Sequence, residues 1–436
     1  MDATTIATHV LTMLGEQGVS LSNNLTDLET IVRDAVLQIG ARAVELKLAQ
    51  QPLGYEGSSR ACDHPYCDHD QKFVEHRPRT LSTLMGQVTI RRAYYHCKHC
   101  GSSCCPYDQQ VGLGTGQMSV GLAKVTTLLA TLDPFIPAAA ILKATTGQRL
   151  GDRTVHKVTT KLGRVASEHE RQLALSMAVW SVPIAGIKAR PRRLYVAVDG
   201  VMVHRQQWNE AKCVTCYWEE SDGKGGVRRQ ARYRVRFEAA EQFKAFVWSL
   251  AMQCGLESAV EVVLLGDGAA WIWDHIAPVL GEKTLCITDW YHVMEHVWDC
   301  GKILFGTQTP ETTAWVKQQE TQLWEGRYQQ LIVELKDQRR QSRSIPKRAA
   351  LEDLITYLTN QEDRIAYDRF RAANCDIGSG RVESACKHVV ANRMKRSGML
   401  WSDEGAQYLL SLRTAYLNGE WEQLWSQKPL LQKHAA

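Results

Sequence analysis

The sequence predicts a multidomain protein that combines an α/β core with helical regions and a small cysteine-rich β module. Three observations lead to this prediction. The chain has 436 residues, more than one hydrophobic core usually serves, so we expect roughly two to four folded units. Residues 194–265 alternate between strand-like and helical patterns, as in α/β proteins. Cysteines and histidines gather between residues 62 and 105, whereas helical spacing dominates after residue 289.

Composition and charge narrow the class of protein. We find no stretch of roughly 18 uncharged apolar residues, the length a membrane-spanning helix needs. The start, residues 1–5, lacks the basic and apolar segments of a secretory signal, so we expect a cytoplasmic, reducing location. The 13 cysteines, an odd number, then favour buried thiols or metal ligands over disulfides. The formal net charge of +5 permits nucleic-acid binding without requiring it.

The first two predicted regions differ in their periodicity. Residues 1–55 form a helical region, because apolar residues recur at helical spacing from Leu28 to Ile39. Residues 56–116 form a β-rich module, because the β-branched and aromatic run at 88–95 is typical of a strand.

Two cysteine pairs flank that strand. They are Cys62 with Cys67 and Cys97 with Cys100, and four thiolates suit a tetrahedral structural zinc ion. Such a site can contribute about 10 to 16 kcal/mol of apparent binding energy to the folding of a small module. Inert buried thiols are the alternative. The first pair is more widely spaced than a typical zinc knuckle, which leaves four substitute ligands open: His64, His69, Cys104 and Cys105.

Residues 117–185 are predicted to form helices that include a helix-turn-helix. Breaks at Asp133-Pro134 and Thr146-Gly147 separate the helices, and Asp152 is expected to cap the recognition helix. The first residues of such a helix contact phosphates or base edges in a major groove. An ordinary helical hairpin is the alternative. The predicted DNA contacts are Arg153, Thr154, His156 and Lys157.

Two aspartates are predicted on neighbouring strands. Asp199 lies in the strand-like run 194–203, and Asp267 directly follows the run 260–265. Ligands of open α/β sheets gather beyond strand ends, so both carboxylates would line one crevice. Their repulsion calls for a cation, and Mg²⁺ (or Mn²⁺) suits oxygen ligands. The other predicted elements are strands at 212–218 and 232–237 and a helix at 241–254.

A third carboxylate would complete a site for phosphoryl transfer. Two metal ions about 3.5 to 4 Å apart activate the attacking oxygen and stabilise the leaving oxygen in such a reaction. The best candidate is Glu383, which follows a Gly/Ser turn at 378–380 near a helix start. The alternative is that the Asp-Gly pairs begin turns and that Glu383 complements a helix dipole.

In their order along the chain, these motifs resemble the bacterial insertion-sequence transposases of the ISKra type. That DDE group has a ribonuclease H-like catalytic fold. The resemblance runs through most of the chain and rests on segments at 198–200 (VDG), 266–269 (GDGA), 271–273 (WIW), 289–296 (DWYHVMEH), 378–384 (GSGRVES) and 393–401 (RMKRSGMLW).

The resemblance implies a layout for the catalytic part. Residues 190–292 and 372–420 would form the ribonuclease H-like core, in which Asp199, Asp267 and Glu383 are the acidic triad. The interval at 293–371 would be a helical insertion, similar to that of hAT and Mutator transposases.

Two kinds of phosphate contact are also expected. Asp289 and His292 resemble the C/DxxH motif of the eukaryotic relatives. His292 would contact a scissile phosphate while Asp289 orients its ring, although a packed surface histidine is the simpler alternative. Apart from the resemblance, the cations Arg393, Lys395 and Arg396 follow Glu383 on the same predicted helical region, so we expect them to bind DNA phosphates near the acids.

The expected activity is that of a DNA transposase. It would cleave at the inverted repeats of a transposon and join the released ends to target DNA, acting as a homodimer or larger assembly. A zinc-dependent DNA-binding regulator with a repurposed core and a nuclease of the same fold are the alternatives. The tryptophans Trp290, Trp298, Trp315 and Trp324 are interpreted chiefly as core residues, with base stacking as the alternative.

Overall fold

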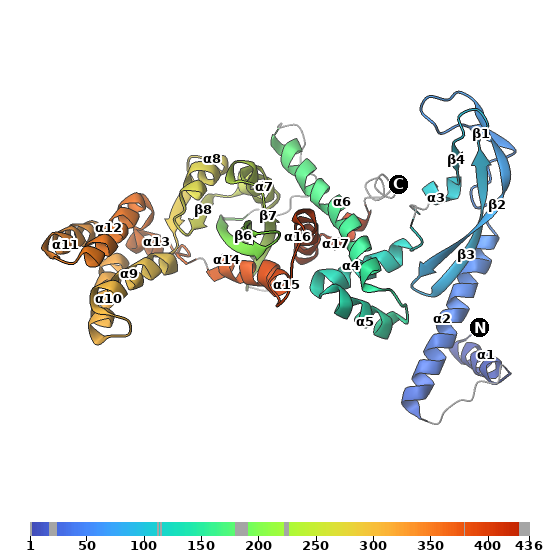
Figure 1. The fold of residues 1–436 in the computed structure, drawn as a ribbon, viewed down its shortest axis with the longest axis horizontal. Coiled ribbons are helices and arrows are strands. Elements are labelled where there is room, and N and C mark those ends of the chain that lie inside the picture. The colour runs from blue at the N-terminus through green and yellow to red at the C-terminus, as the bar shows by residue number, and fades with distance from the viewer. Residues whose placement is uncertain are drawn as a thin grey trace. The chain divides into compact units, whose positions relative to one another are not determined.

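The computed structural model has mixed α/β architecture with two β-sheets (Figure 1). It describes residues 2–16, 24–110, 113, 116–178, 191–221, 226–378 and 380–426. The chain divides into two compact units: unit 1 is Met1–Val165 with Trp421–Ala436, and unit 2 is Ala166–Glu420. Among the helices formed by the described residues, none has the length and apolar character needed to cross a membrane.

Unit 1 contains a four-stranded antiparallel sheet in the order β1-β2-β3-β4. The predicted strand at 88–95 is confirmed as part of β3. Its long partner β2 was not predicted, because most of its side chains are exposed and its many charged residues break the alternation that marks a strand. The strands are β1 (Ser59–Ala61), β2 (Asp70–Thr83), β3 (Gly86–His96) and β4 (Ser103–Cys104).

Helices complete unit 1. The predicted breaks are confirmed: α4 ends before Asp133, and α5 ends at Gly147, which adopts the left-handed conformation that favours glycine. Asp152 is the first residue of α6, and Gly151 supplies the carbonyl that accepts the first helical bonds. The helices are α1 (Ala3–Glu16), α2 (Leu25–Ala49), α3 (Pro106–Gln110), α4 (Val120–Leu132), α5 (Phe135–Thr146) and α17 (Trp421–Ser426), with α6 (Asp152–Ala178) running on into unit 2.

Unit 2 is built on a five-stranded sheet in the order β7-β6-β5-β8-β9. The first three strands along the chain are antiparallel, and β8 and β9 run parallel to β5. Four strands match the prediction, but the four-residue β9 was too short to give a clear pattern. The strands are β5 (Arg193–His204), β6 (Trp208–Ser221), β7 (Val227–Arg236), β8 (Glu261–Gly266) and β9 (Leu285–Thr288).

The two faces of this sheet belong to different hydrophobic clusters, because side chains alternate along each strand. Val196 and Val198 of β5 pack with a first group of helices, between residues 240 and 280, whereas Tyr195 and Ala197 pack with a second group, from residue 290 onward. The first group is α7 (Ala240–Gln253), η2 (Ile272–Ile276) and α8 (Ala277–Leu280), near a short turn η1 (Leu256–Ser258).

The second group of helices contains the predicted insertion. It shares one hydrophobic cluster with the sheet, so the insertion is an integral part of unit 2. Its helices are α9 (Trp290–Phe305), α10 (Pro310–Trp324), α11 (Tyr328–Gln341), α12 (Ile345–Asn360), η3 (Glu362–Arg364) and α13 (Tyr367–Ala372), followed by α14 (Gly380–Ala385), η4 (Cys386–Ala391), α15 (Asn392–Met394) and α16 (Asp403–Leu417).

These boundaries regroup the predicted domains. The helical region 117–185 is divided between the two units within α6, and residues 179–185 lie outside the described part of the chain. The helix α9 begins at Trp290, three residues before the predicted start of the insertion at 293, and Asp289 caps it.

Candidate functional site

The parallel strands of unit 2 bring three aspartates into one row. Leu265 of β8 lies opposite Ala197 of β5 on one side and Ile287 of β9 on the other. An aspartate stands two positions further along the chain in each case. The row is therefore Asp199, Asp267 and Asp289. The predicted convergence of the first two aspartates is explained by this register.

Asp199 is half-buried, and its surroundings oppose its charge. Its Oδ1 accepts a 2.6 Å hydrogen bond from the Gly200 amide. Burial is the largest influence and raises the pKa of Asp199, and the charge of Asp267 raises it further, against the opposing effects of Gly200, Cys386 and His292. A cation beside the two carboxylates would relieve this repulsion.

Asp267 lies in a tight turn after β8. Its Oδ1 accepts a 2.9 Å hydrogen bond from the Ala269 amide. Gly268 has a φ of 101°, which a residue with a side chain rarely adopts, so the Asp-Gly pair has the turn role that was the alternative interpretation. The turn and a metal-binding role are compatible, because a carboxylate has two oxygens and this bond uses one of them.

The helical insertion holds this turn from the other side. The Tyr357 hydroxyl donates to the Asp267 carbonyl at 3.0 Å, and Gln361 Nε2 donates to the Gly268 carbonyl at 2.9 Å. Gln361 Oε1 accepts from the Thr288 hydroxyl at 3.0 Å, which joins the ends of β8 and β9. Sequence reasoning missed these two positioning residues, because they follow Asp267 by about ninety residues and carry no local motif.

Asp289 has a structural role that the motif alone did not predict. It is fully buried, and its Oδ1 accepts a 2.9 Å hydrogen bond from the His292 amide, which caps α9. The Nδ1 atom of the His292 ring lies 3.1 Å from Glu295 Oε2. Glu295 is thus a carboxylate that contacts this nitrogen, and the expected orientation of the ring by Asp289 stays a prediction.

Glu383 is exposed on α14, a helix that packs against β5 and β6. One turn later, the thiol of Cys386 lies between Asp199 and Cys213, and contact with these groups together with burial raises the pKa of Cys386. Glu383 precedes Cys386 by three residues, about one helical turn.

The three predicted acids do not form a closed set of ligands in the part of the chain that the structure describes. Within the described residues, one group of three or more His, Cys, Asp or Glu side chains has all its ligand atoms within 4.8 Å of one another, and that group is made of cysteines. The structure couples Asp199 to Asp267 and places Glu383 on the adjacent helix.

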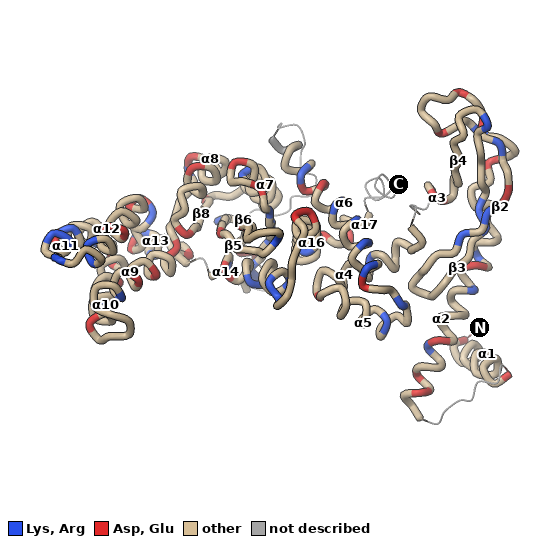
Figure 2. Tube along the Cα trace, viewed as in Figure 1, with Lys and Arg blue, Asp and Glu red and all other residues tan. Residues whose placement is uncertain are grey.

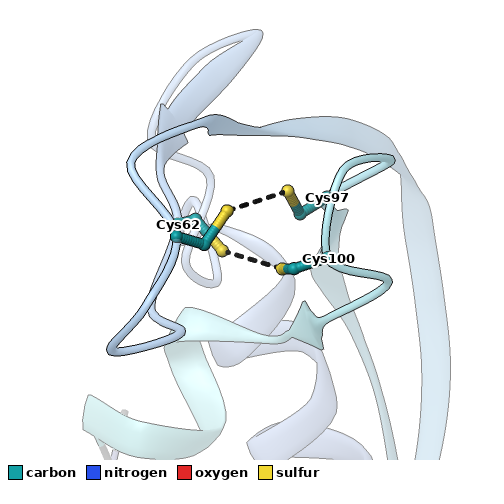
Figure 3. A group of neighbouring side chains, drawn as sticks. Cys62, Cys97 and Cys100 are labelled. Atoms are coloured by element: carbon teal, nitrogen blue, oxygen red, sulfur yellow. Dashed lines mark hydrogen bonds between the residues drawn. The ribbon is translucent and has the colours of Figure 1, made fainter.

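The cysteine group consists of the four predicted zinc ligands, Cys62, Cys67, Cys97 and Cys100. The Sγ atoms of Cys62 and Cys100 are 3.5 Å apart, and those of Cys67 and Cys97 are 3.8 Å apart. A tetrahedron with metal–sulfur bonds of about 2.3 Å has sulfur–sulfur edges of about 3.8 Å. Figure 3 shows Cys62 facing Cys97 and Cys100 from the opposite loop. The group could hold a metal ion such as zinc.

Local hydrogen bonds shape this cluster. Cys97 accepts a bond from the Gly101 amide at its carbonyl and donates its own amide to the Ser102 carbonyl, so the second loop is a tight turn. Hydrogen bonds with Ser102 lower the pKa of the Cys100 thiol to about 6. The fully buried Gln71 donates to Ser102 Oγ at 3.2 Å. The lowered pKa favours the thiolate, the form that binds metal, at Cys100. The pKa of Cys67 moves the other way: a hydrogen bond with the His69 backbone lowers it, but burial and the neighbouring thiols outweigh that bond and raise it to about 12.

The four substitute ligands lie outside the cluster. Cys104 accepts a 2.9 Å hydrogen bond from Arg60 and donates to Gln71, and burial raises the pKa of Cys105. His69 stacks on His99 with ring centroids 3.7 Å apart. These residues, together with His64, support the loops rather than belonging to the group of mutually close sulfurs.

The four predicted DNA contacts on α6 are on the surface, where a phosphate could reach them. Val155 and Thr159 form the buried side of this turn, packed within unit 1. Lys and Arg residues are interspersed with Asp and Glu through both units, so binding would depend on such local sites (Figure 2). The exposed residues are Arg153, Thr154, His156 and Lys157.

The second predicted basic group is only partly on the surface. Lys395 and Arg396 are exposed, but Arg393 is 1% exposed, with its guanidinium 5.1 Å from the ring centre of Trp401. Its expected role in DNA binding is therefore corrected to one in packing the segment before α16. The sequence did not predict this burial, because a short helix followed by a turn is too short to show a periodic pattern that indicates a buried face.

Comparison with known proteins gives the family. A protein from Streptococcus gallolyticus, described as "UPF0236 protein in vanSb 3'region", is 23% identical over 353 residues, which cover 79% of this chain and 74% of that protein. The pattern of an uncharacterised protein family, UPF0236, matches residues 66–428, a span that includes the acidic row and every member of the cysteine cluster except Cys62. The chain is a member of the UPF0236 family.

Proposed function

We propose that this protein is a DNA transposase of the DDE type, with a ribonuclease H-like core in unit 2. The observation that carries the proposal is the β5–β8 register that sets Asp199 beside Asp267, with Glu383 on α14, which packs against β5 and β6. The order of the sheet supports it, because three antiparallel strands followed by two parallel ones are the arrangement expected of that core.

Each acid would have a distinct part in holding Mg²⁺ or Mn²⁺. Asp199 and Asp267 fit the chemistry of a divalent cation, since each is an oxygen donor and together they repel. Glu383 would complete the set from α14. Such ions would polarise the phosphodiester and activate the attacking oxygen. Tyr357 and Gln361 hold the main chain at Asp267 and so fix its position.

The other parts would bind DNA. His292 and the exposed Lys395 and Arg396 would contact phosphates near the acids, and α6 would present its surface cations to the inverted repeats. Zinc at the cysteine cluster would stabilise unit 1. A homodimer or larger assembly would hold two transposon ends and the target DNA together.

The test is a cleavage and joining reaction with purified protein, Mg²⁺ and DNA that carries the element's inverted repeats. We expect cleavage and strand transfer, and the loss of both in Asp199→Ala, Asp267→Ala and Glu383→Ala. Glu404→Ala, on the exposed start of α16, is the matched control and should keep full activity. Cleavage without joining would establish a nuclease, and DNA binding without cleavage would establish a regulator; either result overturns the proposal.

A further inference from the structure

A cavity of about 710 Å³ opens in unit 2 between the starts of α9 and α14 and the length of α10. Its lining includes Trp290, Tyr291, Lys317, Trp324, Gly378 and Arg381. This volume lies in the range of about 300 to 1,000 Å³ that is usual for small-molecule sites. The cavity is distinct from the acidic row, although Tyr291 precedes His292 and Arg381 lies two residues before Glu383.

Two aromatic side chains are exposed at this cavity. Tyr291 is 59% exposed and Trp324 is 41% exposed. Trp290 was interpreted as a core residue, and its 8% exposure confirms that; Trp324 departs from the same interpretation. Large aromatic rings that remain in water beside a cavity offer flat surfaces for stacking.

The surrounding contacts hold both rings in position. The Arg371 guanidinium lies 3.5 Å from the ring centre of Trp324, and Trp290 meets the same ring edge-on with centroids 5.2 Å apart. Tyr291 packs directly on Gly378, where a Cβ atom would come within 2.8 Å of the tyrosine ring. The glycine of the GSGRVES motif is thus explained by close packing against Tyr291. Rings fixed in this way bind a flat partner at little entropic cost.

Cations stand beside the rings. The side chain of Lys317 is 72% exposed, and its ammonium lies 2.8 Å from Glu320. Arg381 lies 3.5 Å from Asp376. Exposed ion pairs of this kind contribute about 0 to 1 kcal/mol, so a phosphate can compete for the cations. Aromatic rings next to competing cations match a nucleotide, which has a flat base and a charged phosphate.

We propose that this cavity binds a nucleotide unit of an unpaired DNA strand. The base stacks on Tyr291 and Trp324, and its phosphates interact with Lys317 and Arg381. This inference rests on the proposed function, because it places unpaired DNA beside the acids as the substrate to be cut. In a duplex the base faces are covered by their neighbours, so the cavity selects a strand that is locally single.

The test measures binding without added Mg²⁺, in the full-length protein and in Asp199→Asn. The probes are a labelled oligothymidylate of about 15 nucleotides, which is within the usual range of single-strand sites, a duplex of the same length, and thymidine monophosphate. Tyr291→Ala and Trp324→Ala should each weaken oligothymidylate binding about tenfold and leave duplex binding unchanged. Trp324→Phe should retain most of the affinity, because it keeps a stacking surface.

Matched controls lie on α9 outside this lining. Trp298 is 38% exposed and the side chain of Lys302 is 45% exposed, so Trp298→Ala and Lys302→Ala should bind the oligonucleotide like the parent protein. Circular dichroism should show equal helix content in all variants. The proposal is overturned if the cavity variants bind the oligonucleotide as tightly as the parent protein does. It is also overturned if they lose duplex binding to the same extent as oligonucleotide binding.

A free nucleotide carries the same flat base and charged phosphate as a DNA strand, so it is tested as the other ligand. Binding of thymidine monophosphate that depends on Tyr291 and Trp324, with oligothymidylate binding that does not, would assign the cavity to a free nucleotide and overturn the DNA inference. Because no cleavage is measured, the result is separate from the proposed activity. Single-strand binding through this cavity in a protein that fails the cleavage test would refute the transposase and keep the inference of a nucleotide site.

Discussion

The cysteine cluster of unit 1 and the acidic row of unit 2 assemble by different physical routes. The four thiols come from two loops within 39 residues of sequence, and local hydrogen bonds bring their sulfurs to tetrahedral spacing. Asp199 and Asp267 of the row come from separate strands, and the third predicted acid, Glu383, comes from a helix, so these three acids span 185 residues. Burial and the charge of Asp267 oppose the charge of Asp199. Thiols can be uncharged, so the folding of two nearby loops is enough to bring them together. Carboxylates repel one another, so the surrounding tertiary structure must hold them in place.

Loss of the cysteine cluster should have the largest effect. Cys97→Ser is expected to abolish stoichiometric zinc binding and unfold the β module, since such sites contribute about 10 to 16 kcal/mol of apparent binding energy. Zinc content by elemental analysis and limited proteolysis of unit 1 measure this. Cys104→Ser, in the same module but outside the cluster, should keep about one zinc ion per chain. A zinc-free parent protein with a protease-resistant unit 1 would refute the prediction.

Unit 2 should depend instead on a buried ion network. Glu170 of α6 accepts hydrogen bonds from Arg234 at 2.7 Å and Arg236 at 2.9 Å, and all three side chains are buried. Removal of one partner leaves buried charge uncompensated, so Glu170→Ala should lower the free energy of unfolding of unit 2 by about 3 to 5 kcal/mol. Denaturant titration measures this loss, and zinc content should not change. Glu168→Ala, at a half-buried position two residues earlier on α6, is the matched control.

The same network predicts a pH dependence. Burial alone would raise the pKa of Glu170, but the charges of Arg234 and Arg236 prevail and lower it below the usual range. A lowered carboxyl pKa contributes stability that is complete above the unfolded-state pKa of about 4.3 and is lost as pH falls through the folded-state value. Unfolding titrations between neutral and acid pH should show this loss in the parent and little of it in Glu170→Gln. Equal slopes in both proteins would contradict the prediction.

A smaller effect is expected at the support of Asp267. Gln361→Ala removes two hydrogen bonds at the ends of β8 and β9, and Tyr357→Phe removes one. At about 1 kcal/mol for each bond, we expect a roughly 30-fold and a roughly fivefold loss of Mn²⁺ affinity or cleavage rate, respectively. Tyr328→Phe, on α11 of the same insertion, should behave like the parent. Equal activity in Gln361→Ala and the parent would show that the insertion does not position Asp267.

The smallest predicted change is a gain in stability. Burial, and then Asp267, raise the pKa of Asp199, so the folded state favours the protonated carboxyl. Stability from this group is present below its unfolded-state pKa and is lost as pH rises through the folded-state value. Asp199→Asn should therefore raise the free energy of unfolding at neutral pH without metal, by about 0.5 kcal/mol, as substitutions at functional sites often do. The gain should vanish at acid pH. An Asp199→Asn variant that is less stable than the parent at neutral pH would contradict the prediction.

Local patterns were enough to predict much of the architecture. The run at 88–95, four of the five strands of unit 2 and the helix breaks at Asp133 and Gly147 follow from short-range periodicity and turn chemistry. The cysteine ligands were predictable for the same reason, because their loops are local. The row of Asp199 and Asp267 was accessible because each residue ends or interrupts a strongly apolar strand.

Tertiary structure alone decided which residues share a site and which are buried. Pairing brings β9 and the polar β2 into sheets that their own sequences did not predict, because a strand is also defined by its neighbours. Tyr357 and Gln361 reach the turn at Asp267 across about ninety residues, and Arg393 is enclosed although its neighbours Lys395 and Arg396 are exposed. Sequence by itself determined the elements and the kinds of side chain available; long-range packing determined their partners, because burial and register are properties of the folded chain as a whole.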